Sequence, residues 1–106
     1  MNTLNQAYKI VEWCRKHFSI PDGVEITCKL NIYDDMDCWG FCEEDEGKYR
    51  IVVSANQSLR DFVATIVHEM VHVMQWETDT WDGDGEAEAS HLQYSVTDKL
   101  WSEGVL

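Results

Sequence analysis

The sequence is poor in basic residues, in proline and in long apolar stretches. Its 106 residues include 8 lysines and arginines against 20 aspartates and glutamates, a formal net charge of -12 at pH 7. This charge repels phosphate groups and anionic lipid headgroups, so we expect neither nucleic acid nor a membrane as a direct partner. Charges interrupt the N-terminal stretch, which therefore resembles neither a secretion signal nor a membrane span, and a cytoplasmic location is expected.

Breakers of regular structure are also scarce, with one proline and six glycines, while apolar residues make up 44% of the chain. This composition is typical of a globular protein and argues against a disordered or fibrous one. No internal repeat or linker-like tract divides the sequence. We therefore expect a single domain over residues 1–106, large enough for one hydrophobic core and no second module.

Cysteines are few and their spacing is uninformative. The four are Cys14, Cys28, Cys38 and Cys42. Without a secretion signal they are expected to be reduced thiols. The closest pair, Cys38 and Cys42, does not have the spacing of a zinc ribbon and has no second pair to complete a four-ligand site, so we expect no structural zinc there.

Hydrophobic periodicity predicts an α+β fold. Apolar residues at three- and four-residue steps predict an N-terminal helix that ends before Pro21. Alternation of apolar and polar residues over 24–32 predicts a strand with one exposed face. The runs 38–42 and 49–54 flank an acidic turn and predict a hairpin, which gives a small twisted sheet of three or four strands.

Two helices are predicted in the second half of the chain. The first begins after Ser58, whose spacing to Asp61 is an acidic variant of a capping box, and extends to about Trp76. A loop rich in glycine and aspartate follows it. The second helix extends from Glu86 to about Glu103 and is expected to pack near the first.

The segment HEMVH, residues 68–72, lies on the first of these helices. His68 and His72 are four residues apart, so their imidazoles lie on one helix face and can converge on a metal ion. Glu69 is turned toward the open side of such a metal, where its carboxylate can take a proton from a bound water. The alternative is a pair of ordinary polar residues on a helix flank. Imidazole nitrogens without partners are costly on a helix that is apolar nearly all round, which favours the metal site.

A catalytic zinc site needs a third protein ligand besides a water. The candidates are Glu86, Glu88 and His91, in the segment GDGEAEASHLQY. Helical phase turns His91 away from the apolar stripe of its helix. It leaves Glu86 and Glu88 on the two shoulders of that stripe, so phase does not choose between the carboxylates.

The segments TIVHEMVHVMQW and GEAEAS together resemble the gluzincin metallopeptidases, whose third zinc ligand is a glutamate that starts a later helix. Residues 86–90 resemble the Glu-x-x-Ala-Asp/Asn signature of that group if Glu86 is the ligand, with Ser90 where the family often has Asp or Asn. ImmA/IrrE-like peptidases have a comparable pattern. Residues 38–90 are similar to SprT-like metallopeptidases, in which a histidine in a glycine-flanked turn takes the place of Glu86.

The small size of the chain is closest to the minigluzincins, which resemble the upper, helix-and-sheet half of a larger metallopeptidase. Together these resemblances imply a zincin-like fold, a Zn²⁺ ion held by His68, His72 and Glu86, and hydrolysis of peptide bonds in a polypeptide substrate. Glu69 would be the general base and then the general acid. The basic DNA-binding parts of SprT-like proteases are absent from this acidic chain, so their action on DNA-linked proteins is not implied.

A second interpretation is a non-catalytic or latent zinc-binding interaction module, whose metal stabilises a small core. It follows from the absence of the lower half of larger metallopeptidases, which helps to hold the substrate. Hydrolysis of a non-peptide amide is compatible with the same residues. Nothing in the sequence specifies an oligomeric state.

Residues outside the motif are candidates for contacts with a substrate. In zincins an edge strand binds an extended peptide, and here residues 39–41 or 49–51 could do so. Tyr94 could reach an oxyanion from the later helix, and Trp76 and Trp81 could line the mouth of the cleft. Asp82, Asp84 and Glu86 resemble a fragment of a calcium loop, but the ligand set is too short for an EF-hand.

Overall fold

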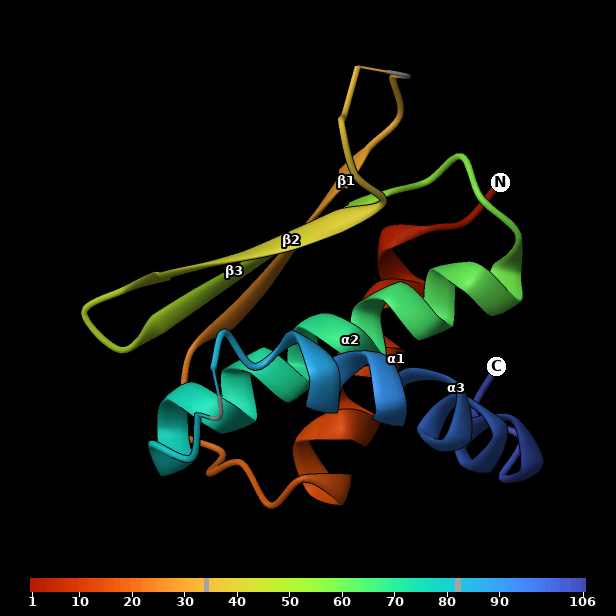
Figure 1. Cartoon of the computed structure of the whole chain (residues 1–106). Helices are drawn as coiled ribbons and strands as arrows, with labels where there is room; N and C mark the ends of the chain where they lie inside the picture. The colour runs from red at the N-terminus through yellow and green to blue at the C-terminus, as the bar shows by residue number, and fades with distance from the viewer. Residues whose placement is uncertain (34, 82) are drawn as a thin grey trace.

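The computed structural model describes residues 1–33, 35–81 and 83–106. Asp82, which was compared above with a ligand of a calcium loop, lies outside the described residues. In this part of the chain three helices and a three-stranded sheet form a small α+β fold, which confirms the expected class (Figure 1). The elements, in chain order, are α1 (Leu4–His17), β1 (Ile26–Asn31), β2 (Gly40–Asp45), β3 (Lys48–Ser54), α2 (Leu59–Thr78) and α3 (Glu86–Ser102).

Local signals account for both ends of α2. The hydroxyl of Ser58 accepts a hydrogen bond from the backbone N–H of Asp61 at 3.1 Å and so satisfies a free donor of the first turn. The helix ends at Asp79, which adopts the left-handed conformation with φ 53°. None of the helices in the described residues is both long enough and apolar enough to cross a bilayer.

The strand order of the sheet is β1-β3-β2, with β1 parallel and β2 antiparallel to β3. The predicted hairpin is therefore present, and Glu46 and Gly47, both with positive φ, form its two-residue turn. Because β3 is the central strand, the expectation that residues 49–51 form an edge for a substrate is wrong. The described strands leave β2 as the edge strand on the side of α2.

The core lies between the sheet and the helices. Figure 1 shows the sheet above α1 and α2, with α3 against α2. Among the described residues the largest side chains that are fully buried are apolar, with a single exception. That exception is Gln75, near the end of α2, whose exposed fraction is 0%.

Gly40 lets the edge strand approach the motif helix closely. A Cβ atom at this position would lie 2.6 Å from Cγ2 of Thr65, a side chain of α2, and 3.2 Å from the carbonyl oxygen of Val52. Any larger residue would push β2 away from α2. The glycine thus helps to place the free edge of β2 directly beside the helix that carries HEMVH.

The four cysteines are free, and they should differ sharply in reactivity. Burial raises the pKa of Cys28 and of Cys42 to about 12, and it raises the pKa of Cys14 further. Cys38 is exposed. Because the thiolate is the reactive form, we expect an alkylating reagent at neutral pH to modify the folded protein once, at Cys38.

Intact-protein mass spectrometry measures this directly. Unfolded protein should take up four adducts, and the folded Cys38→Ser variant should take up none. Rapid modification of a second thiol in the folded protein would contradict the raised pKa values of Cys14, Cys28 and Cys42.

Candidate metal centre

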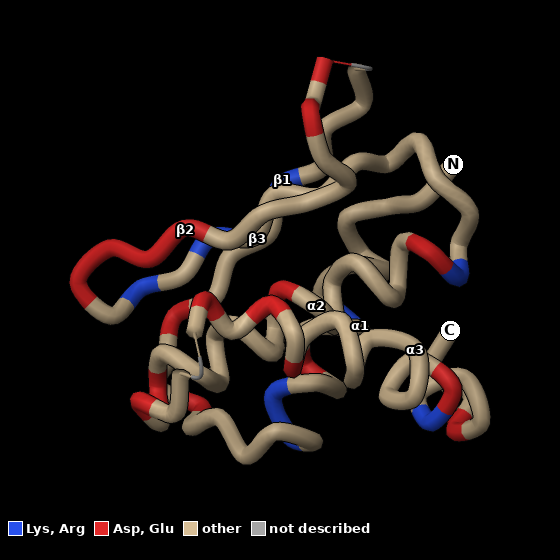
Figure 2. Tube along the Cα trace, in the orientation of Figure 1, with Lys and Arg blue, Asp and Glu red and all other residues tan. Residues whose placement is uncertain are grey.

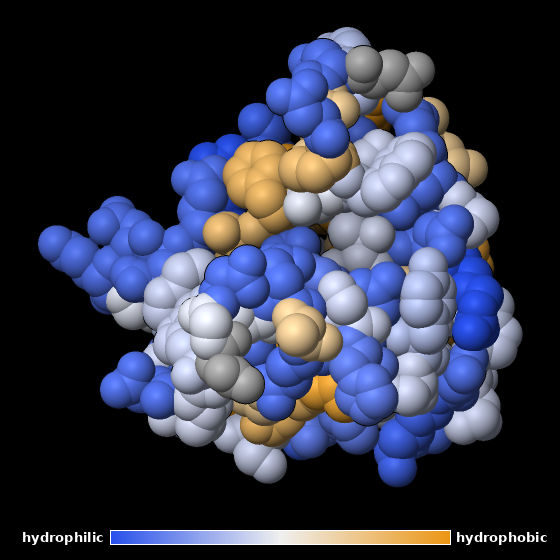
Figure 3. Space-filling model, viewed as in Figure 1, coloured by the Kyte–Doolittle hydropathy of each residue, from blue (hydrophilic) through white to orange (hydrophobic). Residues whose placement is uncertain are grey.

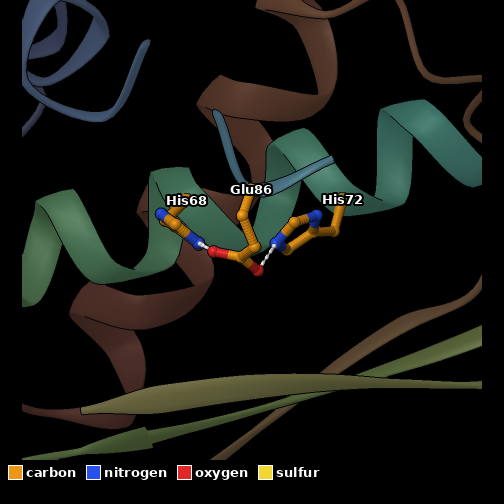
Figure 4. A group of neighbouring side chains, drawn as sticks. All are labelled: His68, His72 and Glu86. Carbon is orange, nitrogen blue, oxygen red and sulfur yellow. Dashed lines mark hydrogen bonds and ion pairs between the residues drawn. The ribbon is translucent and has the colours of Figure 1, made fainter. Parts of the chain in front are cut away.

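The structure brings His68, His72 and Glu86 together (Figure 4). The two histidines project from successive turns of α2, and Glu86 is the first residue of α3. Nε2 of His68 lies 2.9 Å from one carboxylate oxygen of Glu86, and Nε2 of His72 lies 2.8 Å from the other. The ligand atoms of all three residues lie within 4.8 Å of one another.

The loop before α3 positions Glu86. Its last residue, Gly85, has φ 76°, a conformation that glycine adopts without strain. The carboxylate of Asp84 accepts a hydrogen bond from the backbone N–H of Glu86 at 3.0 Å, which satisfies a free donor at the start of the helix. The side chain of Glu86 therefore leaves the first turn of α3 toward α2.

Each histidine has a second partner on its Nδ1 atom. Nδ1 of His68 lies 2.7 Å from Oε1 of Gln93 on α3, and Nδ1 of His72 lies 2.8 Å from Oε1 of Gln75 on α2. The amide nitrogen of Gln75 donates to the carbonyl oxygen of Gly85 at 3.0 Å and to a carboxylate oxygen of Glu88 at 2.8 Å. Both of these partners are acceptors, which fixes the amide with Oε1 toward His72.

This arrangement determines the tautomer of His72. An oxygen that only accepts faces Nδ1, so Nδ1 carries the ring proton. Nε2 of the neutral ring then presents its lone pair to a carboxylate oxygen of Glu86. Two acceptors at 2.8 Å need a positive charge between them, supplied either by a proton or by a metal ion.

The residues fit a zinc ion. Neutral imidazole nitrogens and a carboxylate oxygen are ligands that zinc prefers, and bonds of about 2.0–2.2 Å in a tetrahedron place ligand atoms roughly 3.3 Å apart. Each imidazole nitrogen lies 2.8–2.9 Å from its own oxygen of the Glu86 carboxylate, and one ligand atom from each of the three residues lies within 4.8 Å of the other two, so a small side-chain adjustment brings the set around one ion. Partners on Nδ1 are also typical of metal-bound histidines.

The other two candidates for the third ligand lie outside this group. Glu88 accepts the hydrogen bond from Gln75. His91 is exposed on α3 and does not belong to the cluster. Of the three candidates, it is Glu86 that the structure brings to the histidines.

Glu69, the residue proposed from the sequence as general base, is only 6% exposed and lines the same cleft as the histidines. Burial raises its pKa above the ordinary value for a glutamate, and the nearby carboxylate of Glu86 adds to the rise, whereas His68 and His72 oppose it. Such a carboxylate has a stronger tendency to accept a proton than one in water.

The cleft has a volume of about 860 Å³ and lies between β2, α2 and the start of α3. One wall consists of residues 38–42, which include the start of β2, and Figure 3 shows hydrophobic side chains over this strand. Trp81 stacks on the ring of His72 with centroids 5.9 Å apart and meets Trp76 edge to face at 5.2 Å. Both tryptophans line the cleft, as expected. Tyr94 also lines it and donates its hydroxyl hydrogen to Asp61 at 3.3 Å.

Sequence reasoning missed Gln75 and Gln93. Gln75 lies three residues after His72 and so on a neighbouring position of the same helix face. Gln75 is a polar residue on an otherwise apolar face of α2, and this interruption was the sequence signal that could have identified it. Gln93 gave no comparable signal, because its contact with His68 depends on how α3 packs against α2.

Comparison with known proteins gives no matching family model, no matching curated protein and no matching solved structure. The fold and the site together define a small α+β protein with a His/His/Glu group in a cleft. The resemblance to gluzincins stays a prediction from the quoted segments.

Replacement of Gly85 by alanine should destabilise the protein. A Cβ atom there would lie 2.3 Å from Oε1 of Gln75 and 2.6 Å from the ring of Trp81, and the positive φ adds strain. Overpacking and the left-handed backbone together should lower the free energy of unfolding by about 2–4 kcal/mol, measured by urea denaturation.

Gly83→Ala is the matched control. Gly83 also has a positive φ, 64°, but a Cβ atom there would meet nothing within 4 Å. We expect a loss of about 1–2 kcal/mol from the backbone alone. Equal losses in the two variants would show that Gln75 and Trp81 do not pack tightly around Gly85.

Proposed function

We propose that this protein is a zinc-dependent peptidase with a zincin-like fold. His68, His72 and Glu86 hold the metal, and the convergence of their ligand atoms is the observation that carries the proposal. The zincin-like assignment is supported by the order of an edge strand, a motif helix and a later helix that begins with a glutamate. A zinc ion at this site would polarise a scissile carbonyl and lower the pKa of a coordinated water.

The chain's own residues supply the proton transfers. Glu69 lies next to the first histidine in the sequence and lines the cleft from the same helix. As general base it takes the proton of the attacking water, and as general acid it delivers that proton to the leaving amine. Its burial favours the first of these steps, because the raised pKa makes the carboxylate a better proton acceptor.

A polypeptide fits the shape of this cleft. The free edge of β2 offers backbone N–H and C=O groups to an extended segment, which can add to the sheet as a further strand. Trp39, just before this strand, and Phe41 on it are 61% and 38% exposed and line the cleft, where they can contact substrate side chains. Specificity would then come from side-chain contacts, while the backbone pairing tolerates many sequences.

The test is cleavage of a panel of unstructured proteins, with fragments identified by mass spectrometry. Protein stripped of metal with a chelator should cleave nothing, and addition of zinc should restore cleavage. A wild-type protein that holds one zinc ion per chain and cleaves no member of the panel would contradict the proposal.

The second candidate function is a non-catalytic zinc module. It is favoured by the position of Glu86, whose side chain is 54% exposed and links the start of α3 to α2 through the two histidines. A metal bound there would join the two helices and stabilise the fold by ligand linkage. This function predicts the same zinc-dependent stability with no cleavage of any substrate.

Charge should bias substrate choice toward basic peptides. Among the described residues that line the cleft there are four carboxylates, those of Asp61, Glu69, Asp84 and Glu86, and no lysine or arginine. Figure 2 shows further acidic residues on the β2–β3 turn and on the loop before α3, on the same side of the molecule.

We expect a peptide with lysine near the scissile bond to have a kcat/KM about 3- to 10-fold above that of its glutamate counterpart, since one charge contact near water is worth ~1 kcal/mol. The ratio should shrink as salt is added. An equal or reversed ratio at low salt would contradict this electrostatic bias.

A further inference from the structure

Gln75 is the one polar residue among the largest fully buried side chains of the described chain. Its amide makes three hydrogen bonds, to the ring of His72, to the carbonyl oxygen of Gly85 and to the carboxylate of Glu88. A buried amide that lacked these partners would be costly. The three contacts together therefore hold the side chain in one orientation.

These contacts reach two of the three proposed zinc ligands. Oε1 of Gln75 accepts a hydrogen bond from Nδ1–H of His72, which leaves the lone pair of Nε2 available to bind a metal. The amide nitrogen holds the carbonyl group of Gly85, and the peptide bond of that carbonyl leads directly into Glu86. One side chain of α2 thus fixes the ring of one ligand and the backbone from which another ligand projects.

The surroundings of Gln75 restrict it further. Gly85 passes so close that a Cβ atom there would lie 2.3 Å from Oε1 of Gln75, and the ring of Trp81 packs on the same glycine. Trp81 also stacks on His72. The amide therefore cannot turn away from His72 without moving the loop that leads into α3.

We infer that Gln75 is a positioning residue for the metal site: it selects the Nδ1-protonated tautomer of His72 and holds the start of α3 so that Glu86 reaches the same point. The inference rests on the proposed zinc site. It also distinguishes Gln75 from Gln93, whose contact at the site is with a single ligand, His68.

The experiment compares three substitutions that remove an amide and keep the side-chain length: Gln75→Met, Gln93→Met and Gln57→Met. Gln57 is the control, because its amide also makes partly buried hydrogen bonds, to the backbone carbonyl of Ser54 and the hydroxyl of Thr65, neither of which is a proposed ligand. Zinc affinity is measured by competition with a chromophoric chelator. Long-range ¹⁵N–¹H spectra of the metal-free proteins, recorded at a pH high enough for the imidazole to be neutral, report which nitrogen of His72 carries the proton.

Gln75→Met should weaken zinc binding about 10- to 100-fold, the usual effect of losing a partner of a metal ligand. The spectrum of His72 should lose its Nδ1-protonated pattern. Gln93→Met should weaken zinc binding less and leave the His72 spectrum unchanged. Gln57→Met should lower stability and leave both zinc affinity and the His72 spectrum as in the wild type.

If Gln75→Met does not fold, the inference is tested instead with Gln75→Glu and with the double variant Gln75→Glu/Glu88→Gln. Gln75→Glu keeps an acceptor for His72 but places a carboxylate against Glu88 and against the carbonyl of Gly85, so zinc binding should weaken. Adding Glu88→Gln supplies an amide at position 88 that donates to this carboxylate. The double variant should therefore bind zinc more tightly than Gln75→Glu alone.

Three results would overturn the inference: a Gln75→Met protein that binds zinc like Gln57→Met, one in which His72 keeps its Nδ1 proton, or a double variant no better than Gln75→Glu. Failure of the proposed function looks different. If the wild type binds no zinc, the peptidase proposal falls, while the spectrum of His72 in metal-free protein still tests the role of Gln75.

Discussion

Glu86→Gln should lower zinc affinity by more than 100-fold, because loss of a direct ligand exceeds the roughly 10- to 100-fold cost of losing an outer partner. An amide oxygen at this position carries no charge to balance the metal and binds zinc poorly. The fold should tolerate the change, since the side chain of Glu86 is 54% exposed. Zinc affinity by chelator competition and metal content of the purified protein are the measurements.

The other two candidates for the third ligand provide the controls. Glu88→Gln should reduce zinc affinity far less, because Glu88 contacts the site only through Gln75. His91→Ala should leave zinc affinity unchanged, because His91 lies outside the group. Full zinc content in the Glu86 variant, combined with loss in either of the others, would show that the wrong third ligand was assigned.

Glu69→Gln should reduce kcat about 10²- to 10⁴-fold while zinc content stays at the wild-type level, the usual range for loss of a general acid–base group. The glutamine amide fills nearly the same volume as the Glu69 carboxyl group, which belongs to a residue that is only 6% exposed. The amide cannot accept the proton of the attacking water. The substitution thus separates proton transfer from metal binding. Initial rates on a cleaved substrate, with the zinc content of each preparation, make the measurement.

Glu44→Gln is a matched control, an exposed glutamate on β2 beyond the residues that line the cleft. Its kcat should equal that of the wild type. A Glu69→Gln protein that keeps most of its activity would exclude Glu69 as the general base. Loss of both activity and zinc would instead indicate that Glu69 supports the metal site structurally.

The sequence was most informative about α2. Its long apolar periodicity and the capping signal at Ser58 predicted the start of the helix, and the end was found at Thr78, two residues beyond the expected Trp76. The spacing of His68 and His72 predicted that they share a face, because four-residue spacing follows from helix geometry alone. Glu86 is also the first residue of α3, as predicted.

Helical phase could not select among the third-ligand candidates, and the choice of Glu86 came from the gluzincin resemblance; the structure groups this residue with the histidines. Which residue reaches the histidines depends on the loop between the helices, whose path is set by the left-handed Asp79 and by Gly85 packed on Gln75 and Trp81. These are contacts between different segments of the chain, and the periodicity of a single helix does not predict them. The buried Gln75 was missed for the same reason, because its partners come from α3 and the loop before it.

The order of the strands in the sheet is the second feature that could not be predicted from the sequence. Alternation predicted the strands and the acidic turn predicted the hairpin, both of which depend on nearby residues. The parallel pairing of β1 with β3 joins segments about twenty residues apart in the chain, and no local pattern specifies it. As a result residues 49–51 were expected at an edge, although β3 is central and only β2 borders the cleft among the described strands.

The most direct test of the central claim is a titration of metal-free protein with zinc, in which peptide cleavage is followed at each addition. The account predicts that cleavage rises with added zinc and reaches its plateau at one equivalent per chain, and that Glu69→Gln binds the same equivalent without cleaving. Cleavage that is already complete without zinc, or no cleavage after one equivalent is bound, would contradict it.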